Sequence, residues 1–159
     1  MILTPNEAAT FLKEEKKKLL VAGSMCNDLE VGGKKLLDYV VEIAKLTDTP
    51  IAATGNTMLQ LVKLKEDNEI KAKKMMVADV INFIRAEKWE EPITPERPEL
   101  LVFLGYYPDV ARMLISTVKN TKTMFLDCRY LEGATYSTPD LSSKEWDDFL
   151  NKLIDNLKS

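Results

Sequence analysis

The sequence contains no histidine, and it contains only two cysteines, Cys26 and Cys128. Without histidine the chain lacks the commonest general base and the commonest neutral metal ligand. Ser/His/Asp and Cys/His nucleophilic catalysis within the chain is therefore excluded. Two thiolates far apart in the sequence are too few for a closed tetrahedral metal site or an iron–sulfur cluster, which each take about four protein ligands. We predict no catalytic residues and no metal site.

Long apolar runs and a charge excess are absent as well. No stretch approaches the roughly 18–20 apolar residues of a membrane-spanning helix, and no signal peptide opens the chain. We therefore expect a cytoplasmic protein with reduced thiols and no membrane contact. The formal net charge is -3, from 22 basic and 25 acidic residues, which argues against the concentrated basic face that binds nucleic acid. The 159 residues suit one domain spanning residues 1–159.

Four short apolar runs are present, and each ends at Gly or Cys. They span residues 18–23, 51–55, 100–105 and 123–128. Because these runs do not alternate between apolar and polar residues, they indicate strands covered on both faces, as in a parallel sheet flanked by helices. We predict an α/β fold with a three-layer, Rossmann-like sheet. Ligands of such sheets bind beyond the carboxyl ends of the strands, so the candidate binding residues are Gly23, Ser24, Gly55, Asn56, Gly105, Tyr106, Cys128 and Arg129.

Each candidate residue has a structural alternative. A Gly at a strand end lets a ligand approach the backbone closely, or it only permits a tight turn. Tyr106 could stack on a flavin or adenine ring, or pack onto a partner protein. Arg129 suits a bidentate phosphate contact, or it pairs with Glu132 or Asp140 in the following loop. The residues alone leave these alternatives open.

The usual phosphate-binding fingerprints are missing, because neither Gly-x-Gly-x-x-Gly nor Gly-x-x-x-x-Gly-Lys-Ser/Thr occurs. We interpret Gly32-Gly33 as the start of a helix over residues 32–46 rather than as a phosphate loop. Capping boxes at Thr4 and Ser142 predict the first and last helices. Apolar periodicity predicts helices at residues 5–17, 57–65, 75–86 and 108–120 and from 143 to the C-terminus, with residues 66–74 ambiguous.

Residues 87–99 contain three prolines and five glutamates. This composition predicts an irregular surface connection rather than a helix or a strand. Trp89 and Ile93 within it either anchor the connection on the body of the protein or contact a partner. We favour anchoring.

Several segments together resemble one known family, the epsilon subunit of the archaeal acetyl-CoA decarbonylase/synthase (carbon monoxide dehydrogenase) complex. They occur in order and at suitable spacing from about Lys18 to Leu157. They comprise residues 18–23, 38–44, 49–55, 101–105, 113–118, 128–130, 138–142 and 145–146. The family pattern has His where this chain has Asn56.

The resemblance implies an accessory, non-catalytic subunit in acetyl-CoA metabolism and methanogenesis. In that family the epsilon subunit associates with the large alpha subunit, whose nickel–iron–sulfur cluster oxidises carbon monoxide. The epsilon subunit is expected to stabilise this assembly. Electron transfer towards FAD is a further expectation. The implied fold is a deoxyhypusine-synthase-like NAD/FAD-binding domain.

The partner contacts and one alternative function remain open. Exposed aromatic residues would contact the large subunit, the candidates being Trp89, Tyr106, Tyr107 and Tyr136, and self-association is a further expectation. The alternative function is a stand-alone flavin- or nucleotide-binding module of an oxidoreductase, which would use the crevice at Gly23, Gly55, Gly105 and Arg129.

Overall fold

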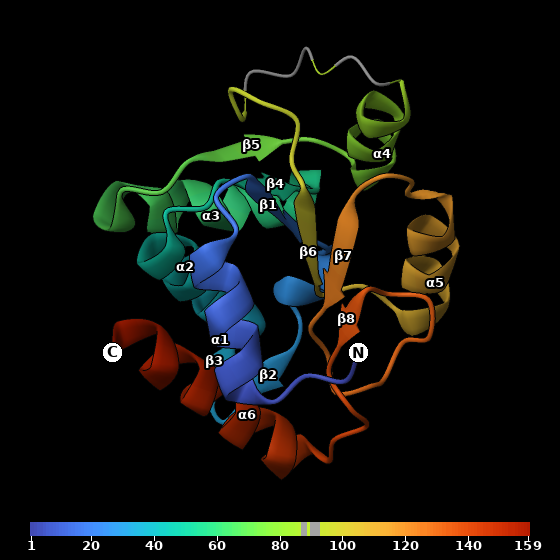
Figure 1. The fold of residues 1–159 in the computed structure, drawn as a ribbon. Coiled ribbons are helices and arrows are strands. Elements are labelled where there is room, and N and C mark those ends of the chain that lie inside the picture. Colours follow the sequence, from blue (N-terminus) through green and yellow to red (C-terminus); the bar gives the residue numbers. More distant parts are fainter. Residues whose placement is uncertain (87–88, 90–92) are drawn as a thin grey trace.

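The computed structural model describes residues 1–86, 89 and 93–159, except for the side chains of residues 65–68. A parallel sheet lies between two layers of helices (Figure 1). Its strands follow the order β5-β4-β1-β6-β7-β8. Their bounds are β1 (Lys18–Ala22), β4 (Ile51–Ala53), β5 (Ala72–Lys74), β6 (Leu100–Leu104), β7 (Lys122–Phe125) and β8 (Tyr136–Ser137). The predicted three-layer, Rossmann-like α/β architecture is confirmed, whereas its deoxyhypusine-synthase-like subtype stays a prediction.

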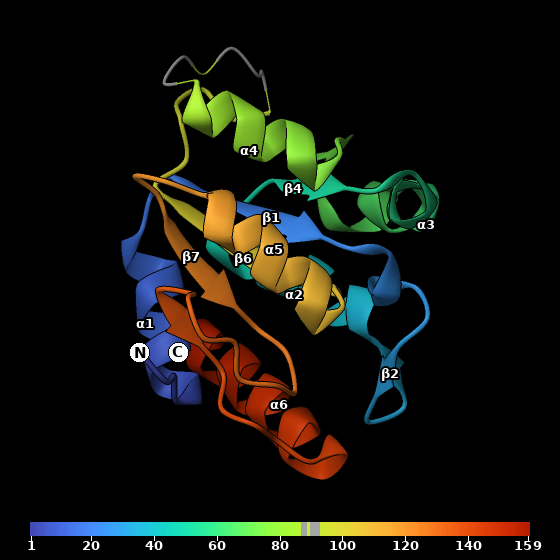
Figure 2. The ribbon, with the colours of Figure 1, turned by 90° about the vertical axis from the view of Figure 1, so that its right-hand side faces the viewer.

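The helices cover the two faces of the sheet unequally, as Figures 1 and 2 show. One face packs against α1 (Pro5–Glu14), α2 (Leu36–Thr47), α3 (Gly55–Asn68) and α6 (Ser143–Lys158). The other carries α4 (Val77–Arg85) and α5 (Pro108–Thr117). Alternate residues of β1 serve both layers, with Leu20 in the first core and Leu19 and Val21 in the second. The strands are apolar throughout because both of their faces are buried.

The predicted start of a helix at Gly32 is wrong. Residues 32–33 form the turn of a small hairpin between β2 (Glu30–Val31) and β3 (Lys34–Lys35), and helix α2 begins only at Leu36. Gly32 and Gly33 have φ values of 58° and 81°, and two consecutive positive φ values are the requirement of the commonest two-residue hairpin turn. A Cβ on Gly32 would also overlap the carboxylate of Asp147 on α6.

Several boundaries differ from the sequence-based expectations. The ambiguous stretch 66–74 continues α3 to Asn68 and then forms β5, and β8 lies inside the loop that follows β7. A 3-10 helix, η1 (Ser24–Cys26), follows β1. Short, polar edge strands such as β5 carry little hydrophobic pattern, because edge strands commonly expose charged side chains. Within the described residues, no helix is both long and apolar enough to cross a membrane.

The connection between α4 and β6 is anchored on the protein body, as predicted for Trp89 and Ile93. Indole Nε1 of Trp89 donates a hydrogen bond to the carbonyl oxygen of Thr94 at 3.1 Å, and its ring meets Phe83 edge-on. Ile93 is buried in the second core. The prediction of irregular structure at residues 87–88 and 90–92 lies outside the described residues.

Candidate functional site

The topology brings the predicted strand ends to one edge of the sheet. From β1 the chain crosses to β4 and then β5, and it returns to β6 on the other side of β1. The connections therefore diverge between β1 and β6, which is the topological switch point where open α/β sheets bind ligands. Across the sheet, the strand ends follow the order Gly55, Gly23, Gly105 and Cys128.

Protein groups pack closely against the two glycines at the switch point. A Cβ on Gly23 would overlap the carbonyl oxygen of Gly105 and lie 3.0 Å from ring atom Cδ1 of Tyr106. A Cβ on Gly105 would overlap Sγ of Cys26 and lie 2.9 Å from the backbone nitrogen of that residue. Gly105 also has a φ of 78°, which L-residues rarely adopt. The two glycines let the loops after β1 and β6 close against each other.

Hydrogen bonds hold these two loops together. The amide of Gly23 donates to the carbonyl of Leu104 at 2.8 Å, and the amide of Met25 donates to the carbonyl of Gly105 at 3.1 Å. From α3, the buried hydroxyl of Thr57 donates to the carbonyl of Gly23 at 3.0 Å. The end of β1 is thus bonded on both sides, to the β6 loop and to α3.

Cys26 is a structural thiol of this closed region. It is fully buried, and its Sγ donates to the carbonyl of Leu104 at 3.4 Å. Burial raises the pKa of the Cys26 thiol to about 12. Because the thiolate is the nucleophile and the metal ligand, Cys26 is unreactive near neutral pH.

Three of the four aromatic residues expected to be exposed are not. Tyr106 is buried with its ring edge-on to Phe103 at 5.8 Å, and burial raises its pKa. Trp89 is half-buried, and the half-buried ring of Tyr136 stacks on Phe11 at 4.4 Å. Only Tyr107 of these four is exposed. The expectation fails for the other three because their rings complete the cores beneath the loops.

At the end of β4, the candidate residues lie in the first turn of α3. Asn56 is exposed, and the exposed Ser24 opens the 3-10 helix at the end of neighbouring β1. A Cβ on Gly55 would lie 3.3 Å from Cε and 3.7 Å from Nζ of Lys74 at the end of β5. Polar groups and one cation therefore remain accessible at this part of the edge.

The end of β7 contains a buried carboxylate that the sequence analysis did not select. Burial raises the pKa of Asp127 to about 6, against the opposing effects of the Cys128 backbone amide and the Arg129 guanidinium. The hydroxyl of Thr138 donates to the carbonyl of Asp127 at 2.6 Å and accepts from its amide at 3.2 Å. The sequence feature that could have identified Asp127 is a carboxylate that directly follows an apolar, strand-like run.

Cys128 and Arg129 lie beside this carboxylate. Burial and the charge of Asp127 raise the pKa of the half-buried Cys128 thiol. Arg129 is exposed, and the ion pairs with Glu132 or Asp140 that were one alternative for it do not form among the described residues. Asp140 accepts instead from the backbone amide of Tyr130 at 2.9 Å. In the part of the chain that the structure describes, no cluster of three or more Cys, Asp or Glu could hold a metal ion.

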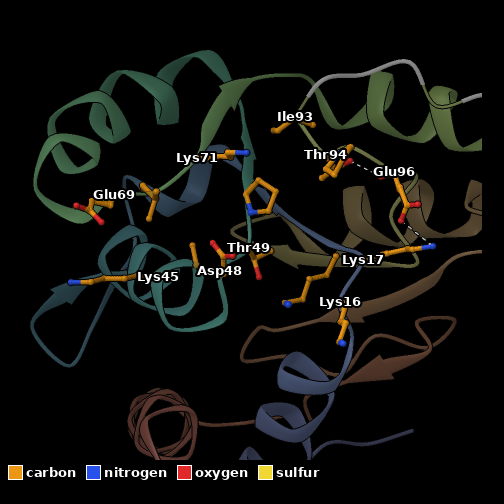
Figure 3. A pocket seen from close by; sticks show the side chains of 15 residues that line it. Lys16, Lys17, Lys45, Asp48, Thr49, Glu69, Lys71, Ile93, Thr94 and Glu96 are labelled. Atoms are coloured by element: carbon orange, nitrogen blue, oxygen red, sulfur yellow. Dashed lines mark hydrogen bonds and ion pairs between the residues drawn. The ribbon is translucent and has the colours of Figure 1, made fainter.

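A cavity of about 520 Å³ lies at the opposite, amino edge of the sheet (Figure 3). Four separate segments line it, namely the turn before β1, the C-terminal end of α2 with the turn to β4, the turn between α3 and β5, and the loop before β6. In the same order, their residues are 16–18, then 44–45 together with 48–50, then 69–71, and finally 93–96. No single segment carries a binding pattern, so sequence analysis had no signal for this cavity.

The lysines of the cavity do not converge on a common point. Lys17 pairs with Glu96 at 3.2 Å, and the buried Lys18 donates from Nζ to the carbonyl of Glu15 at 2.8 Å. In Figure 3 the side chains of Lys16 and Lys45 point away from the space beside Thr49. The helix C-terminal ends of α2 and α3 also meet here, and helix C-termini favour cations. Lys17 and Lys18 thus complement local negative charge rather than form an anion cradle.

Comparison with known proteins identifies the family. A model described as CO dehydrogenase beta subunit/acetyl-CoA synthase epsilon subunit matches residues 1–154. The acetyl-CoA decarbonylase/synthase complex subunit epsilon 1 of Methanosarcina barkeri is 28% identical over 158 residues, which cover 98% of this chain and 88% of that protein. Subunit epsilon of Methanothermobacter thermautotrophicus is 24% identical, over 96% of this chain and 86% of that protein. The chain belongs to the CO dehydrogenase beta subunit/acetyl-CoA synthase epsilon subunit family.

Proposed function

We propose that this chain is an accessory subunit of an acetyl-CoA decarbonylase/synthase complex. In this proposal it binds the large alpha subunit, which carries the nickel–iron–sulfur cluster, and stabilises that component without a catalytic centre of its own. The observation that carries the proposal is the family match over residues 1–154, together with relatives named as epsilon subunits of that complex.

The geometry of the carboxyl edge supports an accessory role. At the point where an α/β enzyme binds its ligand, Gly23 lies against the Gly105 carbonyl and the Tyr106 ring, and Gly105 lies against the Cys26 side chain. The pKa of about 12 keeps the Cys26 thiol neutral and therefore without nucleophilic character. A subunit whose fold encloses no reaction centre can still contribute binding surface and stability to a larger assembly.

We propose that FAD, the cofactor that the family resemblance implies, is not bound at the switch point. A dinucleotide needs room for its pyrophosphate beside the first strand end and a helix N-terminus pointing at it. Here the β6 loop lies in close contact with Gly23, and the hairpin of residues 30–35 separates α2 from the end of β1 along the chain. We therefore include no bound FAD in the proposal and derive no electron-transfer step through it.

Co-purification tests the proposed association. The tagged chain, expressed in its native host, should retain the large subunit through two chromatographic steps, with the untagged strain as control. In a second measurement, the purified large subunit should keep its carbon monoxide oxidation activity longer on heating when the chain is present, because a bound partner stabilises the folded state. Elution of the chain without the large subunit would contradict the proposal.

A titration with FAD tests the alternative function of a flavin-binding module. The free chain and its complex with the large subunit should both leave the fluorescence of micromolar FAD unchanged. A flavoprotein that quenches FAD serves as the positive control. Saturable binding by the chain would instead support the flavin-binding alternative and would show that the loops at the switch point open.

A further inference from the structure

Helix α5 presents an apolar stripe to solvent. Tyr107, Val110 and Met113 recur every three residues and are 62%, 40% and 63% exposed. Ala111 and Ile115 face the other way and are buried in the second core. Figure 2 shows α5 in the outer layer, beside α4 and with its outward side uncovered. We refer to Tyr107, Val110 and Met113 as the α5 stripe.

Two opposite charges accompany the α5 stripe on the solvent side of the helix. Asp109 and Arg112 have side chains that are 95% and 64% exposed, and their charged groups lie 3.6 Å apart in one chain. Such an exposed pair within one helix contributes little to stability. Because the charges are opposite and one turn apart, however, the surface is complementary to a copy of itself turned by a two-fold rotation.

We propose that α5 is the self-association surface of this protein and pairs antiparallel with α5 of a second copy. A two-fold axis between residues 109 and 112 places Asp109 of each copy against Arg112 of the other, which is the reciprocal pattern of an isologous interface. Val110 then lies close to the axis, and Met113 lies about one turn further along the helix, next to the charge pairs.

The two sheet edges are poorer self-association surfaces than α5. Edge strand β5 ends in the exposed Lys73 and Lys74, and lysines at an edge disfavour strand pairing between molecules. At the other edge, the N-terminal residues already lie along β8. The Ser137 amide donates to the Met1 carbonyl at 2.9 Å, and the Leu3 amide donates to the Ser137 carbonyl at 2.8 Å.

Sedimentation velocity over a range of concentrations tests the proposal with the full chain. The native chain should show a reversible monomer–dimer equilibrium, and Met113→Glu should remain monomeric because it places two carboxylates in the apolar part of the interface. Leu59→Glu is the matched control. Leu59 is 68% exposed on α3, in the opposite helix layer, and its variant should dimerise like the native chain.

Charge reversal distinguishes pairing between copies from an indirect effect on folding. Asp109→Arg and Arg112→Asp should each weaken dimerisation about tenfold, since each creates two like-charge contacts, and tenfold corresponds to about 1.4 kcal/mol. The double variant exchanges the two charges and should restore the native dimerisation constant. Thermal unfolding of each variant checks that it is folded.

Three results would overturn the proposal. They are a native chain that is monomeric at every concentration, a Met113→Glu variant that dimerises like Leu59→Glu, and a double charge variant as weak as either single one. If Met113→Glu is instead defective in retaining the large subunit while the native chain stays monomeric, the stripe binds that different protein and self-association is refuted.

Discussion

Gly105 is the residue on which closure of the switch point depends most directly. It meets two requirements at once, a positive φ of 78° and the absence of a Cβ beside Cys26. Gly33 shares the first requirement, with a φ of 81°, but a Cβ there would meet nothing within 4 Å. Substitutions at these two glycines can therefore separate how much backbone conformation and how much close packing contribute to the free energy of unfolding.

Alanine at these two positions should destabilise the protein to different degrees. Gly33→Ala should lower the free energy of unfolding by roughly 1 kcal/mol, the cost of a left-handed conformation. Gly105→Ala should lower it by about 3 kcal/mol, because overlap with Cys26 is added to the same conformational cost. Urea unfolding of both variants measures the difference. Equal losses would show that the β6 loop moves away freely.

Asp127 should make stability depend on pH. Burial raises its pKa in the folded protein to about 6, whereas an unfolded aspartate titrates at about 3.9. The folded state therefore binds this proton more tightly. The free energy of unfolding is therefore highest below about pH 4, where this residue is protonated in both states. It falls as the pH rises through about 6, where the folded state loses the proton.

The variant Asp127→Asn removes this pH dependence. Relative to the native chain it should gain little stability at pH 4 and roughly 3 kcal/mol at pH 7, as expected for a pKa difference of about two. Chemical unfolding of both proteins between pH 4 and 8 measures the gain. Asp148→Asn, at an exposed position of α6, controls for the loss of one carboxylate. A constant gain across this range would mean that Asp127 ionises as freely in the fold as in the unfolded chain.

At the scale of elements, α6 illustrates a helix start that is specified locally. The hydroxyl of Ser142 accepts from the amide of Glu145 at 3.2 Å, and the carboxylate of Glu145 accepts from the amide of Ser142 at 2.9 Å. This reciprocal pair satisfies two amides that otherwise lack partners in the first turn. The apolar face of the helix, from Trp146 to Leu157, is buried against α1 and α2.

Loss of this cap should be measurable in the whole domain. Ser142→Ala should reduce the free energy of unfolding by about 1 kcal/mol. Ser143→Ala, one residue inside the helix and exposed, should change it by less than about 0.5 kcal/mol. Thermal and urea unfolding provide the comparison. A Ser142→Ala variant as stable as Ser143→Ala would mean that packing alone sets the start of α6.

For the whole molecule, the strand order predicts a gradient of local stability. Strands β1 and β6 are fully buried and hydrogen-bonded on both sides, whereas β5 pairs only with β4. Amide hydrogens in the centre of a sheet exchange only through opening of larger units.

Hydrogen exchange measured by mass spectrometry should reveal this gradient. Peptides that cover β1 and β6 should exchange most slowly, and those that cover β5 should exchange early. Ligands and partners would alter the gradient, so the free chain is the appropriate sample. Protection of β5 equal to that of β1 would contradict the arrangement of the sheet.

The class of the fold and several helix starts could be predicted from the amino-acid sequence. Runs such as residues 18–22 and 100–104 are apolar at every position, and this pattern requires cover on both faces of a strand. Thr4 and Ser142 specify helix starts through hydrogen bonds to residues only three positions away. These features were predictable because their physical causes lie within a few neighbouring residues.

The surroundings of the strand ends could not be predicted from the sequence. The Gly23–Gly105 contact, the raised pKa of Asp127 and the burial of Tyr106 depend on residues distant in the sequence. The same holds for β5 and β8, which are strands only because β4 and β7 offer hydrogen-bonding partners. A glycine at a strand end is compatible with a ligand or with another loop. At Gly23 and Gly105 the structure shows the close contact between loops, which no short stretch of sequence specifies.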